Sequence, residues 1–562
     1  MRLRLTSICF VLLWASCASL SWAGSGTDSK VVLGERLYRT GIGTTGVPVQ
    51  ALSQGDVPLS GAQAACVSCH RPSGLGSSEG GYYVPPISGP LLFAPRKLDR
   101  LRLFPQFFHQ IQPQRFTTRL HQPHMRPGYT LTTLGTVLRT GVDPAGQRLA
   151  TIMPRYKLSA ADLAALDAYL HTLSAHIDPG VDARQIHFAT VFSANVPADE
   201  REAMLGVMRA YLKFHNLRLH EDLSRNRFSP YNRSEFVPIE RAWTLTVWEL
   251  KGAASTWRAQ LEAHYRKDRV FALVGGRVDG SWAGASRFCD AHHIPCLFPD
   301  TDLPAWPPPK DGYTVYFDAG LPLEARVMAD FIGGHDAATT RVVQLAARDA
   351  YGQEPAQVFQ QDLSAHNAKL KQRLISFRGQ AGLEAALRAH GNDAGTTLVI
   401  WPGADVPATV AALAAVRPRA AQIFLPTRAI AAVKADMPPA LADRVRFADP
   451  YELDPASHVR SFETRAWMRT RGLKLTHPLL MFKEYYAMTL LKAALWEISN
   501  DFYRDYLLER VEDESQMDLN PGMFPHLALG PGERFAAKGA YIVAIKPGQP
   551  SGLAPVSAWI TP

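Results

Sequence analysis

The chain has 562 residues, with 60 Lys or Arg against 51 Asp or Glu, and its formal net charge at pH 7 is +9. This length exceeds what one hydrophobic core normally organises and predicts two to four domains. The basic excess is scattered along the chain and does not form the clustered stripe of a nucleic-acid-binding protein.

The first 23 residues are typical of a secretory signal peptide. Two arginines and the apolar stretch 8–20 precede Ser21-Trp22-Ala23, whose small outer residues suit a cleavage site. The apolar stretch is too short to cross a bilayer as a helix. A less favoured alternative makes Cys17 a lipidated first residue, although Trp14 stands where such a motif usually has Leu. We therefore expect export to the periplasm without a transmembrane anchor.

The motif Cys66-Val67-Ser68-Cys69-His70 carries the strongest functional signal. A C-x-x-C-H sequence attaches c-type haem, because its two thiols can form thioethers to one porphyrin and the adjacent imidazole can bind the iron. The alternatives are a redox C-x-x-C pair or half of a zinc site. A zinc site needs a second Cys or His pair, and none stands nearby. We predict one covalent haem c per chain, held by Cys66, Cys69 and His70.

Two helices are predicted around this motif. One runs from Val31 to Arg39, and the other is opened by the near capping box of Ser159 and Asp162. The apolar face of the second helix comprises Leu163, Leu166, Leu170 and Leu173. Met153, followed by Pro154, stands just before it. A Met thioether is a common haem ligand in electron carriers, whereas a Met elsewhere is usually a core filler.

Residues 31–176 resemble a class I cytochrome c. The matching features are the first helix, residues 66–70, Pro85-Pro86, residues 141–146, Met153-Pro154-Arg155-Tyr156 and the terminal helix ending in Tyr169-Leu170. The resemblance implies an all-α domain in which His70 and Met153 are the axial iron ligands. It also implies that a backbone carbonyl of Pro85 or Pro86 orients the His70 ring, and we count Pro86 among the haem-binding residues.

Met153 stands 83 positions after His70, which is far for a small cytochrome and indicates an insertion near Phe93 to Pro127. The insertion contains four rival ligands, namely His109, His121, His124 and Met125. We interpret these four as surface or packing residues.

Beyond residue 176, apolar strand-like runs alternate with helical stretches. Examples are 186–193, 244–250, 270–276, 341–345, 397–401 and 422–425. This alternation predicts parallel sheets of the doubly wound α/β kind. Gly275-Gly276 follows a strand but belongs to no phosphate-binding motif, so no nucleotide site is predicted.

Residues 185–562 resemble the type 1 periplasmic solute-binding proteins of the leucine/isoleucine/valine-binding family. The matching stretches are 270–276, 291–299, 312–317, 348–352 and Tyr485-Tyr486-Ala487. The resemblance implies two α/β lobes joined by a hinge, with a solute cleft between them that can close. The loops that would line this cleft contain Asp279, Ser281, Asp300, Thr301 and Asp302, with Tyr351 in the place of a tyrosine that often lines the cleft.

The acids of these loops would repel an anionic ligand, and Arg277 is the one nearby cation that could attract it. We therefore expect a neutral or cationic solute, with Trp282 and Tyr351 as a possible apolar or cation-binding wall. In the alternative interpretation, Asp300 and Asp302 are simple turn residues.

Cys289 and Cys296 are the two cysteines outside the signal and the haem motif. An oxidising compartment favours a disulfide between them, and the alternative is two buried free thiols.

These features predict a periplasmic mono-haem cytochrome that carries electrons through a His/Met-ligated haem to or from a dehydrogenase or oxidase, with a solute-binding-like module attached. Filling both axial positions leaves no site for oxygen or peroxide, so a redox subunit is favoured over a catalyst. The alternative is a periplasmic solute receptor with a redox-responsive haem domain. A third interpretation, a pentacoordinate haem enzyme such as a peroxidase, requires that Met153 does not bind.

Overall fold

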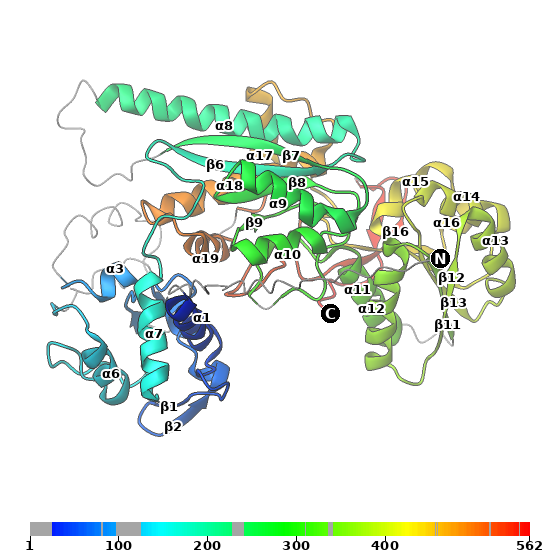
Figure 1. Cartoon of the computed structure of the whole chain (residues 1–562). Helices are drawn as coiled ribbons and strands as arrows, with labels where there is room; N and C mark the ends of the chain where they lie inside the picture. The colour runs from blue at the N-terminus through cyan, green and yellow to red at the C-terminus, as the bar shows by residue number, and fades with distance from the viewer. Residues whose placement is uncertain are drawn as a thin grey trace, which may run out of the picture. The chain divides into compact units, whose positions relative to one another are not determined.

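The computed structural model describes residues 25–79, 82–96, 125–226, 241–309, 311–334, 341–455, 457, 459–515, 519–549 and 551–562. The expected signal peptide and three of the rival ligands, His109, His121 and His124, lie outside these residues. The described residues form two compact units, one ending at Ala175 and the other running from His176 to Pro562 (Figure 1).

The first unit is mainly helical. Its helices are α1 (Ser25–Thr40), η1 (Gly61–Ala64), α2 (Val67–His70), α3 (Gly89–Leu92), α6 (Leu131–Thr140) and α7 (Ala160–Thr172). The predicted capping box opens α7, because Ser159 accepts a hydrogen bond from the Asp162 amide while Asp162 accepts one from the Ser159 amide.

Helices α1 and α7 pack against each other at a point where only glycine fits. A Cβ atom added to Gly34 of α1 would lie 2.0 Å from the Ala165 carbonyl oxygen and 2.7 Å from the Tyr169 Cβ of α7. Tyr38, one turn later, places its ring 5.3 Å from that of Tyr169. This close approach fixes how the first and last helices of the unit pack, and the rest of its core gathers around them.

The first unit is not purely α-helical, which corrects the all-α prediction. Its strands are β1 (Gln50–Ser53), β2 (Val57–Ser60), β3 (Ser77–Glu79), β4 (Tyr82–Val84) and β5 (Arg155–Lys157). Strands β2, β1 and β5 form an antiparallel sheet, and β3 pairs with β4. These strands have three or four residues each, too few to show the alternation by which a strand is recognised in sequence.

The second unit consists of two α/β lobes, each built on a parallel sheet. The first lobe has the strand order β10-β9-β8-β6-β7. Its strands are β6 (Gln185–Ser193), β7 (Ala242–Leu250), β8 (Ala272–Arg277), β9 (Cys296–Leu297) and β10 (Thr314–Val315). Its helices are α8 (Ala198–Asn226), η3 (Ala254–Thr256), α9 (Trp257–Lys267), α10 (Ala283–His292), α17 (Val459–Thr470), α18 (Pro478–Ile498) and α19 (Arg504–Glu514).

The second lobe has the strand order β12-β11-β13-β14-β15-β16-β17. Strands β11 to β15 pair in parallel, whereas β16 is antiparallel to both β15 and β17. Its strands are β11 (Arg341–Ala347), β12 (Lys371–Phe377), β13 (Thr396–Trp401), β14 (Gln422–Pro426), β15 (Val445–Asp449), β16 (Tyr541–Ile545) and β17 (Leu553–Pro555). Its helices are α11 (Gly320–Gly334), α12 (Ala350–His366), α13 (Gly379–His390), α14 (Val406–Val416), η4 (Thr427–Ala429), α15 (Ile430–Asp436) and α16 (Pro439–Ala442).

The chain passes between the lobes three times, after β10, after β15 and after α19. The first five strands of the two lobes have the same order along the chain, 2-1-3-4-5, and the apolar clusters on their sheets form separate cores. The predicted parallel α/β architecture is thereby confirmed. Within the described residues, no helix has the length and apolarity needed to cross a membrane.

Replacement of Gly34 by Ala tests the contact between α1 and α7. We expect Gly34→Ala to lower the free energy of local unfolding by about 2 kcal/mol, because the added methyl overlaps backbone that cannot move away. Amide hydrogen exchange in α7 should then become about thirtyfold faster, since 1.4 kcal/mol corresponds to tenfold. Val32→Ala on the same helix is the control, because Val32 is 64% exposed, and equal exchange in both variants would contradict the packing account.

Candidate functional sites

The Cys66–His70 motif forms the short helix α2, which begins after Cys66 and ends at His70. Cys66 and His70 are buried, whereas Cys69 is exposed. Arg71 adopts a left-handed φ of 66° directly after the helix and so turns the chain away. One short turn thereby presents both thiols and the imidazole from neighbouring positions.

The His70 ring is held from behind by a backbone carbonyl. Its Nδ1 lies 3.0 Å from the carbonyl oxygen of Pro85, so Pro85 and not Pro86 is the partner, which corrects the assignment of Pro86. Gly76 makes this approach possible, since a Cβ there would lie 2.1 Å from the Val84 oxygen and 3.1 Å from the Pro85 oxygen. Nδ1 therefore carries the proton, and Nε2 has no hydrogen-bond partner within the described residues.

Burial also keeps this imidazole neutral. It lowers the pKa of His70 to about 4, although the hydrogen bond with Pro85 acts in the opposite direction. A neutral imidazole with one nitrogen engaged and the other available is the form that binds a metal.

Met153 lies in the turn that leads into β5. Its side chain is partly buried and packs against the same apolar cluster that contains Cys66. The guanidinium of Arg155 donates to the Met153 carbonyl, and β5 pairs with β1 immediately afterwards. Of the four rival ligands, Met125 is the one that lies within the described residues, and its side chain is 51% exposed.

These residues fit a covalently attached haem. Two thiols and an oriented imidazole stand on one turn, and a thioether packs against the apolar core beside them. The donor set combines soft sulfur with nitrogen, as c-type haem attachment requires.

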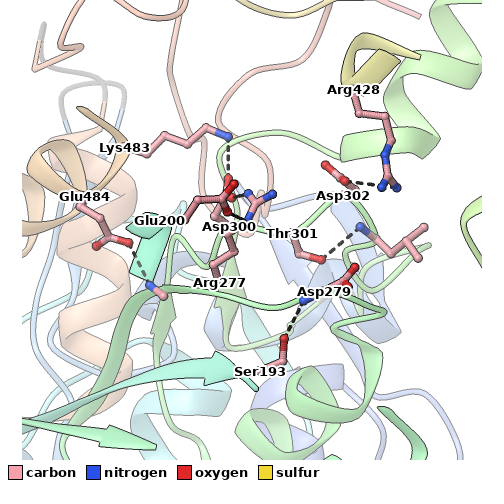
Figure 2. A network of polar contacts seen from close by, with 12 residues as sticks. Ser193, Glu200, Arg277, Asp279, Asp300, Thr301, Asp302, Arg428, Lys483 and Glu484 are labelled. Atoms are coloured by element: carbon pink, nitrogen blue, oxygen red, sulfur yellow. Dashed lines mark hydrogen bonds and ion pairs between the residues drawn. The ribbon is translucent and has the colours of Figure 1, made fainter. Parts of the chain in front are cut away.

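In the second unit, Asp300 follows β9 and is enclosed by cations. It forms ion pairs with Arg277, at the end of β8, and with Lys483 of α18, whose Nζ lies 2.7 Å from Oδ1 (Figure 2). Burial raises the pKa of Asp300, but the charges of Lys483 and Arg277 outweigh it and lower that pKa to about 2. Asp300 is therefore ionised and already neutralised inside the protein. The expectation that it repels an anionic solute is wrong.

The other two acids reach the second lobe. The Tyr351 hydroxyl donates to Asp279 across 2.5 Å, and an Arg428 guanidinium nitrogen lies 3.5 Å from the Asp302 carboxylate (Figure 2 shows the second pair). Tyr351 belongs to α12 and Arg428 to η4, so the predicted loops and the predicted tyrosine do meet between the lobes.

Two further candidates make local contacts. Thr301 donates to the Gly280 carbonyl and accepts from the Leu303 amide, and Ser281 accepts from the Ala283 amide. The two bonds that Thr301 and Ser281 accept are those of turn residues, whereas the bond to Gly280 joins two loops that are 21 positions apart in the chain. Trp282 is fully buried in the core of the first lobe, so the prediction that it forms a wall of the ligand site is wrong.

Sequence reasoning missed Lys483 and Glu484, both on α18. A signal was present, because the two charges interrupt a helix that is otherwise almost entirely apolar over its first half. Glu484 Oε1 accepts the Gly276 amide at 2.9 Å, and Oε2 has no hydrogen-bond partner in the described part of the chain. Burial raises the pKa of Glu484 to about 8, so this carboxyl is protonated at pH 7.

Comparison with known protein families identifies the first unit. Residues 61–174 match the family model described as cytochrome c. The first unit contains a cytochrome c domain. Such a domain carries covalently bound haem c.

A comparison with curated proteins found no match. Among solved structures, the chain is similar to a fatty acid ABC transporter substrate-binding protein from Thermomonospora curvata, with 13% identity, a TM-score of 0.49 and coverage of 69% of this chain and 95% of that chain. It is also similar to a leucine-binding protein from Thermotoga maritima, with 14% identity, a TM-score of 0.47 and coverage of 67% and 99%.

A third similar structure is a branched-chain amino acid ABC transporter from Thermus thermophilus with bound valine. Identity is 12%, the TM-score is 0.49, and the coverage is 68% of this chain and 98% of that chain. Likenesses at this level say nothing about the ligand of the module attached to the cytochrome c domain. The two-lobed fold of that module is established by its own strand order.

The predicted disulfide between Cys289 and Cys296 is not formed in this structure, which holds both residues as buried free thiols. Both side chains lie in the core of the first lobe. Burial raises the pKa of the Cys296 thiol well above its usual value. The thiolate that oxidation requires is therefore disfavoured.

Glu484 generates a pH prediction for the module. Its pKa is about 8 in the folded state against 4.5 ordinarily, so the folded state binds the proton more tightly. The stability that this proton provides is full below pH 4.5 and is lost as the pH rises towards 8. Glu484→Gln is neutral at every pH and should remove this dependence of stability on pH. Its gain in the free energy of unfolding over wild type should be about 2–3 kcal/mol larger at pH 7 than at pH 4.

Urea unfolding followed by tryptophan fluorescence measures this effect, because every tryptophan after residue 24 lies in the second unit. Glu497→Gln on the same helix serves as the matched control. Identical pH slopes in wild type and Glu484→Gln would show that Glu484 is ionised in the folded protein.

Proposed function

We propose that this protein is an exported mono-haem cytochrome that carries electrons, with a two-lobed solute-binding module attached to its cytochrome c domain. The observation that carries the proposal is the buried His70 ring, whose Nδ1 is fixed by the Pro85 carbonyl within a C-x-x-C-H motif. The amino-terminal sequence supports export.

In this proposal, Cys66 and Cys69 hold the haem through thioethers, and His70 and Met153 are the axial ligands. The bound haem supplies a reversible one-electron change at its iron. Pro85 keeps the proton on Nδ1 of His70 and so presents Nε2. The pairing of β5 with β1 and the hydrogen bond from Arg155 hold the turn that carries Met153.

If His70 and Met153 both held the iron, no position would remain for oxygen or peroxide, and the haem would supply electron transfer rather than catalysis. A pentacoordinate enzyme would require that Met153 does not bind. We expect a periplasmic dehydrogenase or oxidase as the redox partner.

The attachment residues are tested by replacing both cysteines. The Cys66→Ala, Cys69→Ala double variant, matured in a host competent for cytochrome c assembly, should lose all covalent haem, because no thiol near His70 remains for the two thioethers. Haem-peroxidase staining of denaturing gels measures the loss. Cys289→Ala, Cys296→Ala is the matched control and should stain like wild type. Staining retained by the Cys66, Cys69 variant would refute the assignment.

The axial ligand is tested by Met153→Ala. We expect loss of the weak near-infrared band of Met-ligated ferric haem and a fall in midpoint potential on the order of 0.1–0.3 V, because the thioether favours ferrous iron. Spectroscopy of the oxidised protein and a redox titration measure the two effects. Met125→Ala is the control, and the assignment is wrong if that variant, not Met153→Ala, loses the band.

A second candidate function is that of a solute receptor. The observation in its favour is that Asp279 and Asp302 of the first lobe meet Tyr351 and Arg428 of the second. Loops after parallel strands are where α/β proteins bind ligands. A thermal-shift screen of neutral and cationic small molecules on the full chain tests this candidate, and leucine, isoleucine and valine belong in the same screen.

A further inference from the structure

Two cross-lobe contacts meet at one place in the second unit. Tyr351 donates to Asp279 across 2.5 Å, and the guanidinium of Arg428 lies 4.3 Å from the centre of the Tyr351 ring and 3.5 Å from Asp302. We call these four residues the clasp. Tyr351 and Arg428 come from the second lobe, and the two acids come from the first.

The clasp is partly buried. Tyr351 is 8% exposed and packs in an apolar cluster with Leu303 and Leu321. The side chain of Arg428 is 19% exposed, and that of Asp302 is 39% exposed. The guanidinium therefore lies against an aromatic ring and beside a carboxylate, and the nitrogen that faces Asp302 is itself buried.

An aromatic ring with a nearby carboxylate is the chemistry by which proteins recognise organic cations. Here that position holds Arg428, which belongs to the same lobe as the Tyr351 ring and to the opposite lobe from the Asp302 carboxylate. The structure assigns Arg428 the role of a tethered cation that occupies this position and keeps the lobes together without a solute. A solute of the receptor proposed above must then carry a guanidinium or amine that displaces Arg428, so the inference rests on that second candidate function.

The surrounding charges favour a cation over an anion. Arg277 and Lys483, the other two cations near these loops, are both paired with Asp300, and Arg277 also pairs with Glu200 at 3.1 Å. Once Arg428 leaves, Asp302 keeps only the attraction of Arg277, which is itself paired with Asp300 and Glu200. The position that Arg428 leaves, with the lobes still together, therefore presents the Asp302 carboxylate and the Tyr351 ring face.

A tethered group competes at high effective concentration, so the wild-type protein should bind a free cation weakly. Removing the side chain in Arg428→Ala ends the competition. We expect calorimetric titration of the full chain with methylguanidinium to show binding at least about tenfold tighter in Arg428→Ala than in wild type. Amide exchange of Leu303 and Leu321 should be faster in the free variant and return towards wild type with the cation.

Three further variants make the outcome decisive. Arg341→Ala removes an exposed ion pair of the same lobe, with Asp393 at 2.9 Å, and should behave as wild type. Asp302→Asn in the Arg428→Ala background should abolish the gained binding. Arg428→Gln replaces Arg428→Ala if the latter does not fold.

Binding that is equal in wild type and Arg428→Ala, or that survives Asp302→Asn, would overturn the assignment. The proposed receptor function has its own test, and it is refuted if no solute in the thermal-shift screen binds the wild-type protein. A cation that rescues Arg428→Ala would then still establish the clasp.

Discussion

The ion pairs of Asp300 fix the end of the first lobe at which Asp279 and Asp302 contact the second lobe. Burying a carboxylate costs several kcal/mol unless a partner compensates it, and Arg277 and Lys483 provide that compensation from two different elements. Lys483 lies 183 positions after Asp300 in the chain. The pairing therefore joins the loops after β8 and β9 to α18, and removing Asp300 would leave the buried Lys483 without its ion-pair partner.

The two candidate sites are built in opposite ways. The cytochrome c domain collects its thiols and imidazole from five consecutive residues, so the sequence alone displays them. The contacts of the second unit combine the loops after β8 and β9 with α18 of the same lobe and with α12 and η4 of the other lobe. Only the folded chain brings those groups together, and the charge of each depends on partners that are distant in sequence.

This difference explains what could be predicted. The capping box of α7, the haem motif and the parallel strands follow from local patterns and hold in the structure. The choice between Pro85 and Pro86 does not, because successive carbonyls of an extended segment point to different sides and only tertiary packing selects one. The same holds for the neutralisation of Asp300, which depends on Lys483, and for the burial of Trp282.

Asp300 was misjudged because a sequence shows a charge without its partners. Its carboxylate read as a repulsive group in a loop, whereas Arg277 and Lys483 enclose it in the folded chain. The disulfide between Cys289 and Cys296 stays a prediction, which rests on the expected export of the chain. The charge state of Asp300 depends on burial, and burial is a property of the whole fold.

Burial also separates the charges that hold the fold from those that can exchange partners. Breaking a buried pair such as Asp300–Lys483 costs about 3–5 kcal/mol, which no weak ligand supplies. Arg428 and Asp302 are partly exposed, and pairs of that kind contribute about 0–1 kcal/mol after solvent screening. This pair therefore changes the ratio of closed to open lobes by less than about tenfold, because a tenfold change in a ratio of populations requires about 1.4 kcal/mol. A solute of modest affinity can therefore exchange with Arg428, while the Asp300 pairs keep the first-lobe loops in place during that exchange.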